Sequence, residues 1–370
     1  MSQFFMKPTL HRLDTVQEFA DTFAIGDGDL LFTSHHVYNA FFAAQNLACD
    51  VIYPKDYGKG EPTDEMIEAM ARDITKDYKR IIAVGGGSIL DVAKFFVLDA
   101  PTPVLDLFDG KRTPKKARAL VLAPTTCGTG SEVTSVAALA LVSRSTKAGY
   151  GNPAMFPDDA VLIPELLQSL PMEPFSTSAI DALVHAVESA LSPKATPIGK
   201  VLSYEAIDLI LRGFKTIVAE GPEARKPLLE DFLFASTYAG VAFSNAGCAA
   251  VHALSYPLGG TFHVPHGESN YAMFTGVMKN YMEICQDGEI AVLNQRMADI
   301  LGCSVAGVYD TLEDLLNHLV QKKPLHAYGM TEAQISEFAD AVYNGQQRLL
   351  VNNFVPFDRD RIEKIYRELY

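Results

Sequence analysis

Short apolar runs alternate with segments of helical spacing over the first 165 residues. Four runs rich in aliphatic and β-branched residues are expected to be strands, at residues 30–33, 50–53, 80–84 and 119–123. Between the second and third runs, Pro62 and the acidic residues that follow it favour a helix start, and apolar side chains then recur at helical spacing. Strands that alternate with helices predict an α/β domain whose parallel sheet carries helices on both faces.

The pattern changes near residue 170, where strand-like runs become scarce. Long stretches of helix-forming residues follow, and we expect helices at residues 177–191, 197–219, 230–242 and 308–320. The sequence therefore predicts two domains, an α/β domain at residues 1–170 and an all-helical domain at residues 171–370. A length of 370 residues also favours two domains.

Composition and charge exclude several classes of protein. The chain has 45 acidic and 31 basic residues, a formal charge of −14, which argues against partners such as nucleic acid or an anionic membrane surface. The longest apolar run, residues 136–142, is far shorter than the ~20 residues that span a bilayer. The five cysteines are scattered without a CxxC pair, and no signal-peptide pattern opens the chain. We expect a cytoplasmic protein.

A glycine-rich turn follows the third expected strand. Gly85, Gly86 and Gly87 lead into a helix that is expected to open at Ser88, with the Ser88 side chain as its N-cap. Glycines let the backbone approach a ligand closely, and a helix start directs N–H groups at an anion such as a pyrophosphate. The alternative is a tight turn between a strand and a helix with no ligand.

A second polar loop follows the fourth expected strand. Residues 123–132 hold four hydroxyl side chains and two glycines, which suits hydrogen bonding to a polar cofactor. The alternative is a turn rich in Ser and Thr that caps a helix. Because the loops after parallel strands meet at one edge of a sheet, the two loops together predict a nucleotide site. Cys127 lies in this loop without an identifiable base and is interpreted as a small filler residue.

A set of potential metal ligands lies in the second domain. Asp181 and His185 are four residues apart in a helical stretch, so both can face one ion. His252, His263 and His266 follow further along. One carboxylate with three imidazoles suits Fe²⁺ or Zn²⁺. The alternative is an ordinary pair on a helix face with unrelated loop histidines.

These residues together resemble the iron-containing alcohol dehydrogenase family. The resemblance spans nearly the whole chain and implies a dehydroquinate synthase-like fold and an NAD(P)-dependent dehydrogenase. The N-terminal domain would bind the dinucleotide, the helical domain would hold iron or zinc, and the substrate would lie between them. The motifs imply four metal ligands, Asp181, His185, His252 and His266.

The resemblance also implies a set of cofactor-binding residues. Those on the glycine-rich turn and its helix would meet the pyrophosphate, the threonines of the second loop would line the nicotinamide, and a lysine would also contact the cofactor. In this sequence they are Gly86, Gly87, Ser88 and Asp91, then Thr125, Thr126 and Thr129, and finally Lys147.

Two positions depart from the family pattern. Many members have a histidine for proton relay one turn after the third metal ligand, where this chain has Tyr256. Tyr256 and His263 are both candidates for the relay, with water or the cofactor ribose as alternatives. Ser34 stands where NAD-preferring members often carry an aspartate for the adenosine ribose, so both NAD and NADP stay open as cofactors.

Within the family, the length and the stretch from His252 to Asn270 most resemble members that interconvert 4-hydroxybutyrate and succinate semialdehyde. A homodimer is expected. Other readings are a related enzyme for butanol, 1,3-propanediol or lactaldehyde, and a lyase of the dehydroquinate synthase type. A metal hydrolase without redox chemistry and a non-enzymatic nucleotide-binding protein are further alternatives. Because cofactor and substrate would be anions, local positive charge is expected at the helix start, Lys94, Lys147 and the metal.

Overall fold

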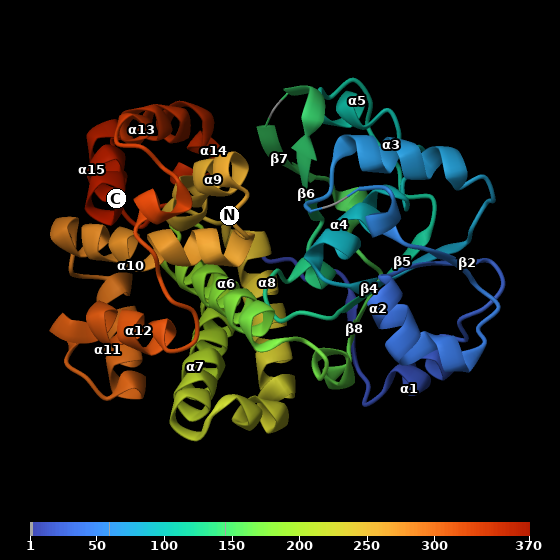
Figure 1. The fold of residues 1–370 in the computed structure, drawn as a ribbon, viewed down its shortest axis with the longest axis horizontal. Coiled ribbons are helices and arrows are strands. Elements are labelled where there is room, and N and C mark those ends of the chain that lie inside the picture. Colours follow the sequence, from blue (N-terminus) through green and yellow to red (C-terminus); the bar gives the residue numbers. More distant parts are fainter. Residues whose placement is uncertain (1–2, 59, 145) are drawn as a thin grey trace. The chain divides into compact units, whose positions relative to one another are not determined.

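The computed structural model describes residues 3–58, 60–144 and 146–370 (Figure 1). These form two compact units, one made of residues 6–170 and the other of residues 171–370 with residues 3–5. The first unit contains a six-stranded parallel sheet of order β1-β8-β5-β4-β2-β3. Its strands are β1 (Thr9–Arg12), β2 (Asp29–Phe32), β3 (Asp50–Ile52), β4 (Arg80–Gly85), β5 (Ala119–Pro124) and β8 (Asp159–Leu162).

The structure confirms the four expected strands as β2, β3, β4 and β5. The sequence did not reveal β1 and β8, which have four residues each. These two strands pair with one another although they lie near opposite ends of the domain's sequence. The apolar run at residues 136–142 contributes β6 (Val136–Leu141), which pairs antiparallel with β7 (Thr146–Gly151) in a separate two-stranded sheet. In the main sheet Gly85 pairs with Pro124, so the loops after β4 and β5 leave the sheet side by side.

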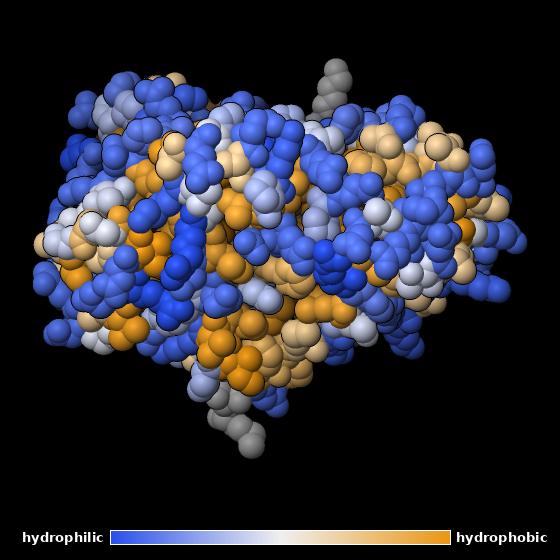
Figure 2. All heavy atoms as spheres, turned by 90° about the horizontal axis from the view of Figure 1, so that it is seen from below, coloured by the Kyte–Doolittle hydropathy of each residue, from blue (hydrophilic) through white to orange (hydrophobic). Residues whose placement is uncertain are grey.

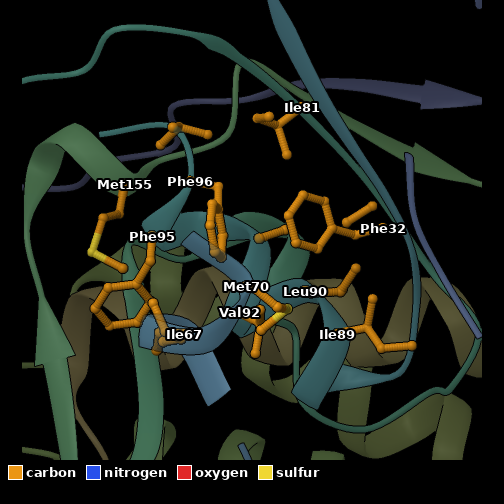
Figure 3. Close-up of a cluster of buried hydrophobic side chains, with 14 of the residues drawn as sticks. Phe32, Ile67, Met70, Ile81, Ile89, Leu90, Val92, Phe95, Phe96 and Met155 are labelled. Carbon is orange, nitrogen blue, oxygen red and sulfur yellow. The ribbon is translucent and has the colours of Figure 1, made fainter. Parts of the chain in front are cut away.

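Helices cover both faces of the main sheet, as the alternation predicts. Ile81 and Ala83 of β4 pack into an apolar cluster with α3 (Asp64–Asp73), α4 (Gly87–Phe95) and α5 (Val104–Phe108) (Figure 3). Ile82 and Val84 point to the opposite face and are also fully buried. Figure 1 shows α1 (Val16–Thr22) and the short α2 (His35–Val37) on that side.

A buried ionic network joins α4 to the segment after β5. The ammonium of Lys94 is fully buried and donates to Asp91, to the hydroxyls of Ser131 and Thr134, and to the carbonyl of Val136. Burial lowers the pKa of Lys94, and the nearby Asp91 carboxylate opposes that shift. These contacts hold α4, which begins at the glycine-rich turn, against the segment that follows β5.

The second unit is built from helices around α6. Residues 179–191 of this helix are all buried, which identifies it as the central helix of the domain. The predicted helices are confirmed, with ends that differ by a few residues. The helices are α6 (Met172–Leu191), α7 (Pro197–Glu220), α8 (Leu229–Ala246), α9 (Ala250–Phe262), α10 (His266–Ile284), α11 (Glu289–Leu301), α12 (Val308–Asn317), α13 (Ala333–Gly345), α14 (Gln347–Leu350) and α15 (Arg359–Leu369).

The surface mixes polar and apolar residues. In Figure 2, hydrophilic residues spread over the face that is drawn, and hydrophobic residues gather in patches between them. Among the described residues, no helix combines the length and the apolar character that a membrane crossing requires.

The network around Lys94 generates a stability prediction. Replacing Lys94 with Met leaves the Asp91 carboxylate without its cation, which costs about 3 kcal/mol for a buried pair. We expect a clear fall in the unfolding midpoint followed by circular dichroism. Neutralising both partners in the Asp91→Asn/Lys94→Met variant should recover part of the loss.

The matched control is Lys76→Met, because Lys76 pairs with Asp50 at an exposed site where ion pairs contribute little. It should leave the midpoint nearly unchanged. Equal midpoints for the Lys94 and Lys76 variants would contradict the role assigned to the buried network.

Candidate functional site

The glycine-rich turn differs in one respect from the sequence expectation. Helix α4 opens at Gly87, and its N-cap is Gly86, which has extended backbone angles of φ −71° and ψ 172°. The prediction that Ser88 is the N-cap is therefore wrong; Ser88 is the second helical residue and is exposed. A glycine cap offers no side-chain acceptor, so the first N–H groups of α4 stay available to an anion.

The two polar loops contact one another. A Cβ atom on Gly87 would lie 2.7 Å from Thr129 Cγ2, and one on Gly86 would lie 3.5 Å from Thr126 Cγ2. The amide of Thr125 donates to the carbonyl of Gly85 at 3.0 Å. The structure therefore brings the glycines and threonines of the expected cofactor site together, and Gly87 is required because a larger residue would overlap Thr129.

Three other expected cofactor residues are engaged within the protein. Asp91 accepts from the Ser131 hydroxyl at 2.6 Å and from the Ala138 amide at 2.9 Å, in addition to Lys94. Lys147 lies in β7 and pairs with the Glu61 carboxylate at 2.5 Å. Ser34 follows β2 and caps α2 by accepting from the Val37 amide.

Lys94 and Lys147 therefore do not supply the free positive charge that the sequence suggested. Lys94 is enclosed by its four acceptors, and the charge of Lys147 is balanced by a carboxylate. Among the charged features expected in this domain, the start of α4 is the one that remains open to an anion.

The four candidate metal ligands converge in the helical domain. Asp181 and His185 lie one turn apart on α6, His252 lies in the first turn of α9, and His266 opens α10. One potential ligand atom from each lies within 4.8 Å of the others. Asp181 Oδ1 lies 3.8 Å from His252 Nε2 and 3.7 Å from His266 Nε2, and the Nε2 atoms of His185 and His252 are 3.0 Å apart.

Close packing of two helices makes this convergence possible. A Cβ atom on Gly267 would lie 2.3 Å from the carbonyl oxygen of Thr177, so the first turn of α10 runs directly against the backbone of α6. Only glycine fits at this approach. Gly267 therefore sets the position of His266, its neighbour, against Asp181 and His185.

Glu188 supports the cluster and was missed in the sequence. Its buried carboxylate accepts from the amides of Ala249 at 2.8 Å and Val251 at 2.6 Å, at the start of α9. It also accepts from His252 Nδ1 at 2.7 Å. Because a carboxylate only accepts, Nδ1 carries the proton and Nε2 presents its lone pair to the cluster. The signal in the sequence is its spacing, since Asp181, His185 and Glu188 share one face of α6.

Asn270 is the second missed residue. It lies one turn after His266 on α10, and its side-chain amide is within 2.7 Å of Asp181 Oδ1, 3.1 Å of His252 Nε2 and 3.3 Å of His266 Nε2. Its Oδ1 atom is buried and, within the described part of the chain, forms no hydrogen bond. The side-chain nitrogen of Asn270 thus lies against three of the four potential ligand atoms, where a bound cation would also have to lie.

The electrostatics of the cluster favour positive charge. Burial alone would raise the pKa of Asp181, but His185, His266 and His252 lower it, so the carboxylate stays ionised. Burial likewise opposes a charged His252, yet Cys248 and Glu188 raise its pKa well above the ordinary value. The acidic neighbours therefore favour positive charge in the cluster, and a metal ion would bind in competition with protons on the imidazoles.

Cys248 completes a neighbouring group of potential ligands with Glu188 and His252. Burial would raise its pKa, but His252 and His185 lower it to about 7. Both Glu188 oxygens already accept hydrogen bonds, so this carboxylate is better explained as support for His252 than as a second ligand set.

The cluster opens on the side of His266. The side chain of His266 is 32% exposed, whereas those of Asp181, His185 and His252 are between 3% and 6% exposed. The Tyr256 ring lies 6.4 Å from the His266 ring on this side. His263 ends α9 in a left-handed conformation, is exposed, and makes no hydrogen bond or ring contact with the cluster within the described residues. Of the two candidates for proton relay, the structure brings Tyr256 to the cluster.

One carboxylate and three imidazoles with an exposed edge fit a divalent transition metal. Such a donor set suits iron or zinc and leaves a position for a further oxygen. The unsatisfied Asn270 oxygen and the Glu188–His252 hydrogen bond agree with this fit.

Comparisons with known proteins agree with both domains. Residues 12–164 match the family described as iron-containing alcohol dehydrogenase, and residues 175–370 match the Fe-containing alcohol dehydrogenase family, C-terminal. The chain is 46% identical over 366 residues to 4-hydroxybutyrate dehydrogenase of Clostridium kluyveri, which covers 99% of each chain. It is 36% identical over 326 residues to long-chain-alcohol dehydrogenase 1 of Geobacillus thermodenitrificans, covering 83% and 78% of the two chains.

The fold also matches solved structures. Sulfoacetaldehyde reductase of Bifidobacterium kashiwanohense, solved with NAD⁺, superimposes with a TM-score of 0.85 at 24% identity, covering 100% of this chain and 98% of the other. A 1,3-propanediol oxidoreductase gives a TM-score of 0.82 at 21% identity over both full chains. The fold and the family inferred from the sequence motifs are confirmed: the chain belongs to the iron-containing alcohol dehydrogenase family.

Proposed function

We propose that the protein is a metal-dependent, NAD(P)-linked dehydrogenase that interconverts 4-hydroxybutyrate and succinate semialdehyde. The observation that carries the proposal is the 46% identity to a 4-hydroxybutyrate dehydrogenase over nearly the entire length of both chains. The convergence of four potential ligands at a partly open cluster supports it, because alcohol oxidation in this family uses a metal.

In this proposal Asp181, His185, His252 and His266 hold Fe²⁺ or Zn²⁺. The bound ion would supply a Lewis acid that favours the alkoxide form of the substrate alcohol. Asp181 contributes a single negative charge, so the centre keeps net positive charge for an oxygen ligand. Glu188 holds the His252 ring in one orientation and one tautomer, and the side chains of Asp181, His185 and His252 are nearly inaccessible to bulk water.

We also propose that the two polar loops bind the dinucleotide, which would accept the hydride from the substrate carbon. The uncapped start of α4 would bind the pyrophosphate, and Thr125, Thr126 and Thr129 would line the nicotinamide. Ser34 offers a hydroxyl but no carboxylate at the end of β2, which is compatible with both NAD and NADP. The expected homodimer stays a prediction.

A dehydrogenase for another alcohol of the same family is the second candidate. The similarity to long-chain-alcohol dehydrogenase 1 favours it, since that relative shares 36% identity. A lyase of the dehydroquinate synthase type would use the nicotinamide only transiently. Stoichiometric production of NADH or NADPH from an added alcohol would therefore exclude the lyase.

An aldehyde panel tests the proposed function. After reconstitution with iron or zinc, succinate semialdehyde, propanal, butanal and lactaldehyde are compared with NADH and with NADPH. We expect kcat/KM for succinate semialdehyde to exceed that for the uncharged aldehydes by about 10-fold or more, since a bound carboxylate adds charge-assisted hydrogen bonds. A wide margin in favour of butanal would reject the proposed substrate.

The position of Tyr256 generates a prediction about proton transfer. Replacing Tyr256 with Phe keeps the ring beside His266 but removes the hydroxyl, and we expect kcat to fall by about 100-fold, the usual contribution of a positioned proton donor. His263→Ala is the matched comparison and should change kcat little, because His263 is exposed at the end of α9. If steady-state kinetics instead show a large loss of kcat in His263→Ala and little change in Tyr256→Phe, the relay is His263.

The hydrogen bond from His252 to Glu188 generates a prediction about metal affinity. In Glu188→Gln the side chain keeps its size, but its NH₂ group must face one of the three donors that now meet the carboxylate. We expect Co²⁺ to bind about 10- to 100-fold more weakly, with a changed visible absorption spectrum.

Glu220→Gln, an exposed change of the same kind at the end of α7, is the control for this experiment. Its affinity and Co²⁺ spectrum should match those of the unmodified protein. Glu188→Gln with a full Co²⁺ affinity and an unaltered spectrum would show that Glu188 serves only to cap α9.

A further inference from the structure

The proposed substrates share a feature that the metal cluster does not recognise. Both 4-hydroxybutyrate and succinate semialdehyde carry a carboxylate at the end opposite the reacting carbon. A carboxylate that leaves water needs a cationic or multi-donor partner. That partner should lie beyond the open side of the cluster, at a distance set by a four-carbon chain.

A cationic side chain lies on this side. The guanidinium of Arg348, on α14, is positioned over the Tyr256 ring, 5.9 Å from its centre. The Tyr256 ring in turn lies 6.4 Å from the ring of His266, the most exposed of the four candidate ligands. Two successive ring contacts thus connect the cluster to an arginine.

Arg348 differs from neighbouring cations in having no carboxylate partner among the described residues. Lys323 also stacks on a tyrosine, Tyr328, but it forms an ion pair with Glu268 at 3.1 Å. Lys322 likewise pairs with Glu313. Because Arg348 is exposed and holds no internal ion pair, its five N–H donors remain available to an anion from solution.

The backbone around Arg348 is hydrogen-bonded to the turn that leads to His252, one of the four candidate ligands. Asn352, one turn further along, donates to the carbonyl of Cys248 at 2.8 Å, in the turn that leads into the helix of His252. The same side chain reaches the carbonyl of Arg348 itself at 3.4 Å. A Cβ atom on Gly247 would lie 2.3 Å from Asn352 Nδ2, so this turn and the segment of Arg348 are in close contact. The backbone of Arg348 is therefore held close to the turn that leads to His252.

We propose that Arg348 is the carboxylate-binding residue of the substrate site and selects ω-oxidised short-chain carboxylates over neutral aldehydes and alcohols. The planar guanidinium can bind both carboxylate oxygens at once. An extended four-carbon chain places its carboxylate about 5–6 Å from the reacting oxygen, and the Tyr256 ring lies between His266 at the exposed edge of the cluster and the guanidinium. The Tyr256 ring holds the guanidinium by a cation–π contact and forms an apolar wall for the methylene carbons. This assignment rests on the proposed function.

The test compares two substrates that differ only at the far end, succinate semialdehyde and butanal. In Arg348→Gln we expect KM for succinate semialdehyde to rise about 10- to 100-fold, the value of hydrogen bonds to a charged group, while kinetics with butanal change less than about twofold. Arg348→Lys should give an intermediate KM, since a lysine supplies charge without the planar pair of donors.

Arg212→Gln is the matched control, because it removes the same charge from an exposed position on α7. It should leave both substrates unaffected. A loss of equal size with butanal and succinate semialdehyde in Arg348→Gln, or no loss with either, would overturn the assignment.

A second probe separates this inference from the proposed function. Butyrate carries the carboxylate without a reacting group, so it should inhibit butanal reduction competitively in the unmodified protein and about 10-fold or more weakly in Arg348→Gln. If butyrate inhibition depends on Arg348 but succinate semialdehyde is a poor substrate, the carboxylate site stands and the proposed substrate fails. Butyrate inhibition that is the same in both proteins would reject the carboxylate site.

Discussion

The helical domain depends on neutralising two carboxylates that α6 carries into its apolar centre. Asp181 and Glu188 are nearly inaccessible to solvent, on a helix whose surrounding residues are almost all buried. Buried charge is strongly unfavourable unless it is paired and hydrogen-bonded. The partners come from elsewhere in the domain, as amides and an imidazole of α9 and as the first two turns of α10. Packing of α9 and α10 against α6 is therefore also what satisfies these charges.

Glu188 links the fold of the domain to the chemistry of the cluster. The first N–H groups of a helix have no intrahelical acceptor, and α9 begins in the interior where water cannot supply one. A single carboxylate satisfies two of these N–H groups and fixes the ring of His252. The orientation of that imidazole is consequently determined by the same contact that starts its helix.

Much of the fold and of the candidate site follows from periodic patterns in the sequence. The strands β2, β3, β4 and β5 were identified because each is a short run rich in apolar residues, and Asp181 with His185 because helical spacing places them on one face. The strands β1 and β8 were missed although β2 is equally short, because β1 has no buried residue and each of the two finds its partner far along the chain. Glu188 and Asn270 were missed although their spacing is equally regular. An acidic or amide residue on a helix is ordinarily solvated, and only the tertiary structure reveals that these two are buried.

Tertiary contacts also explain why the predicted N-cap at Ser88 and the predicted free charge of Lys94 and Lys147 were wrong. Whether Gly86 or Ser88 caps α4 depends on backbone angles that residue type does not determine, because glycine and serine are both acceptable at an N-cap. From residue type alone, Lys94 cannot be distinguished from an exposed lysine, because both carry the same formal charge. Its enclosure by Asp91 and two hydroxyls removes that charge from the surface. Local pairing therefore decides which cations of the chain can meet an anion.

The net charge of −14 is compatible with anionic ligands once pairing is considered. Exposed charges are screened beyond about 8–10 Å at physiological salt, so the acidic surface as a whole opposes a small anion only weakly at close range. At contact distance the relevant groups are those that form no ion pair within the described part of the chain, such as the start of α4 and Arg348. An arginine that acts at contact distance, within an acidic protein, contributes little to long-range attraction. Its effect is on which ligand stays bound, so it determines specificity more than the rate of encounter.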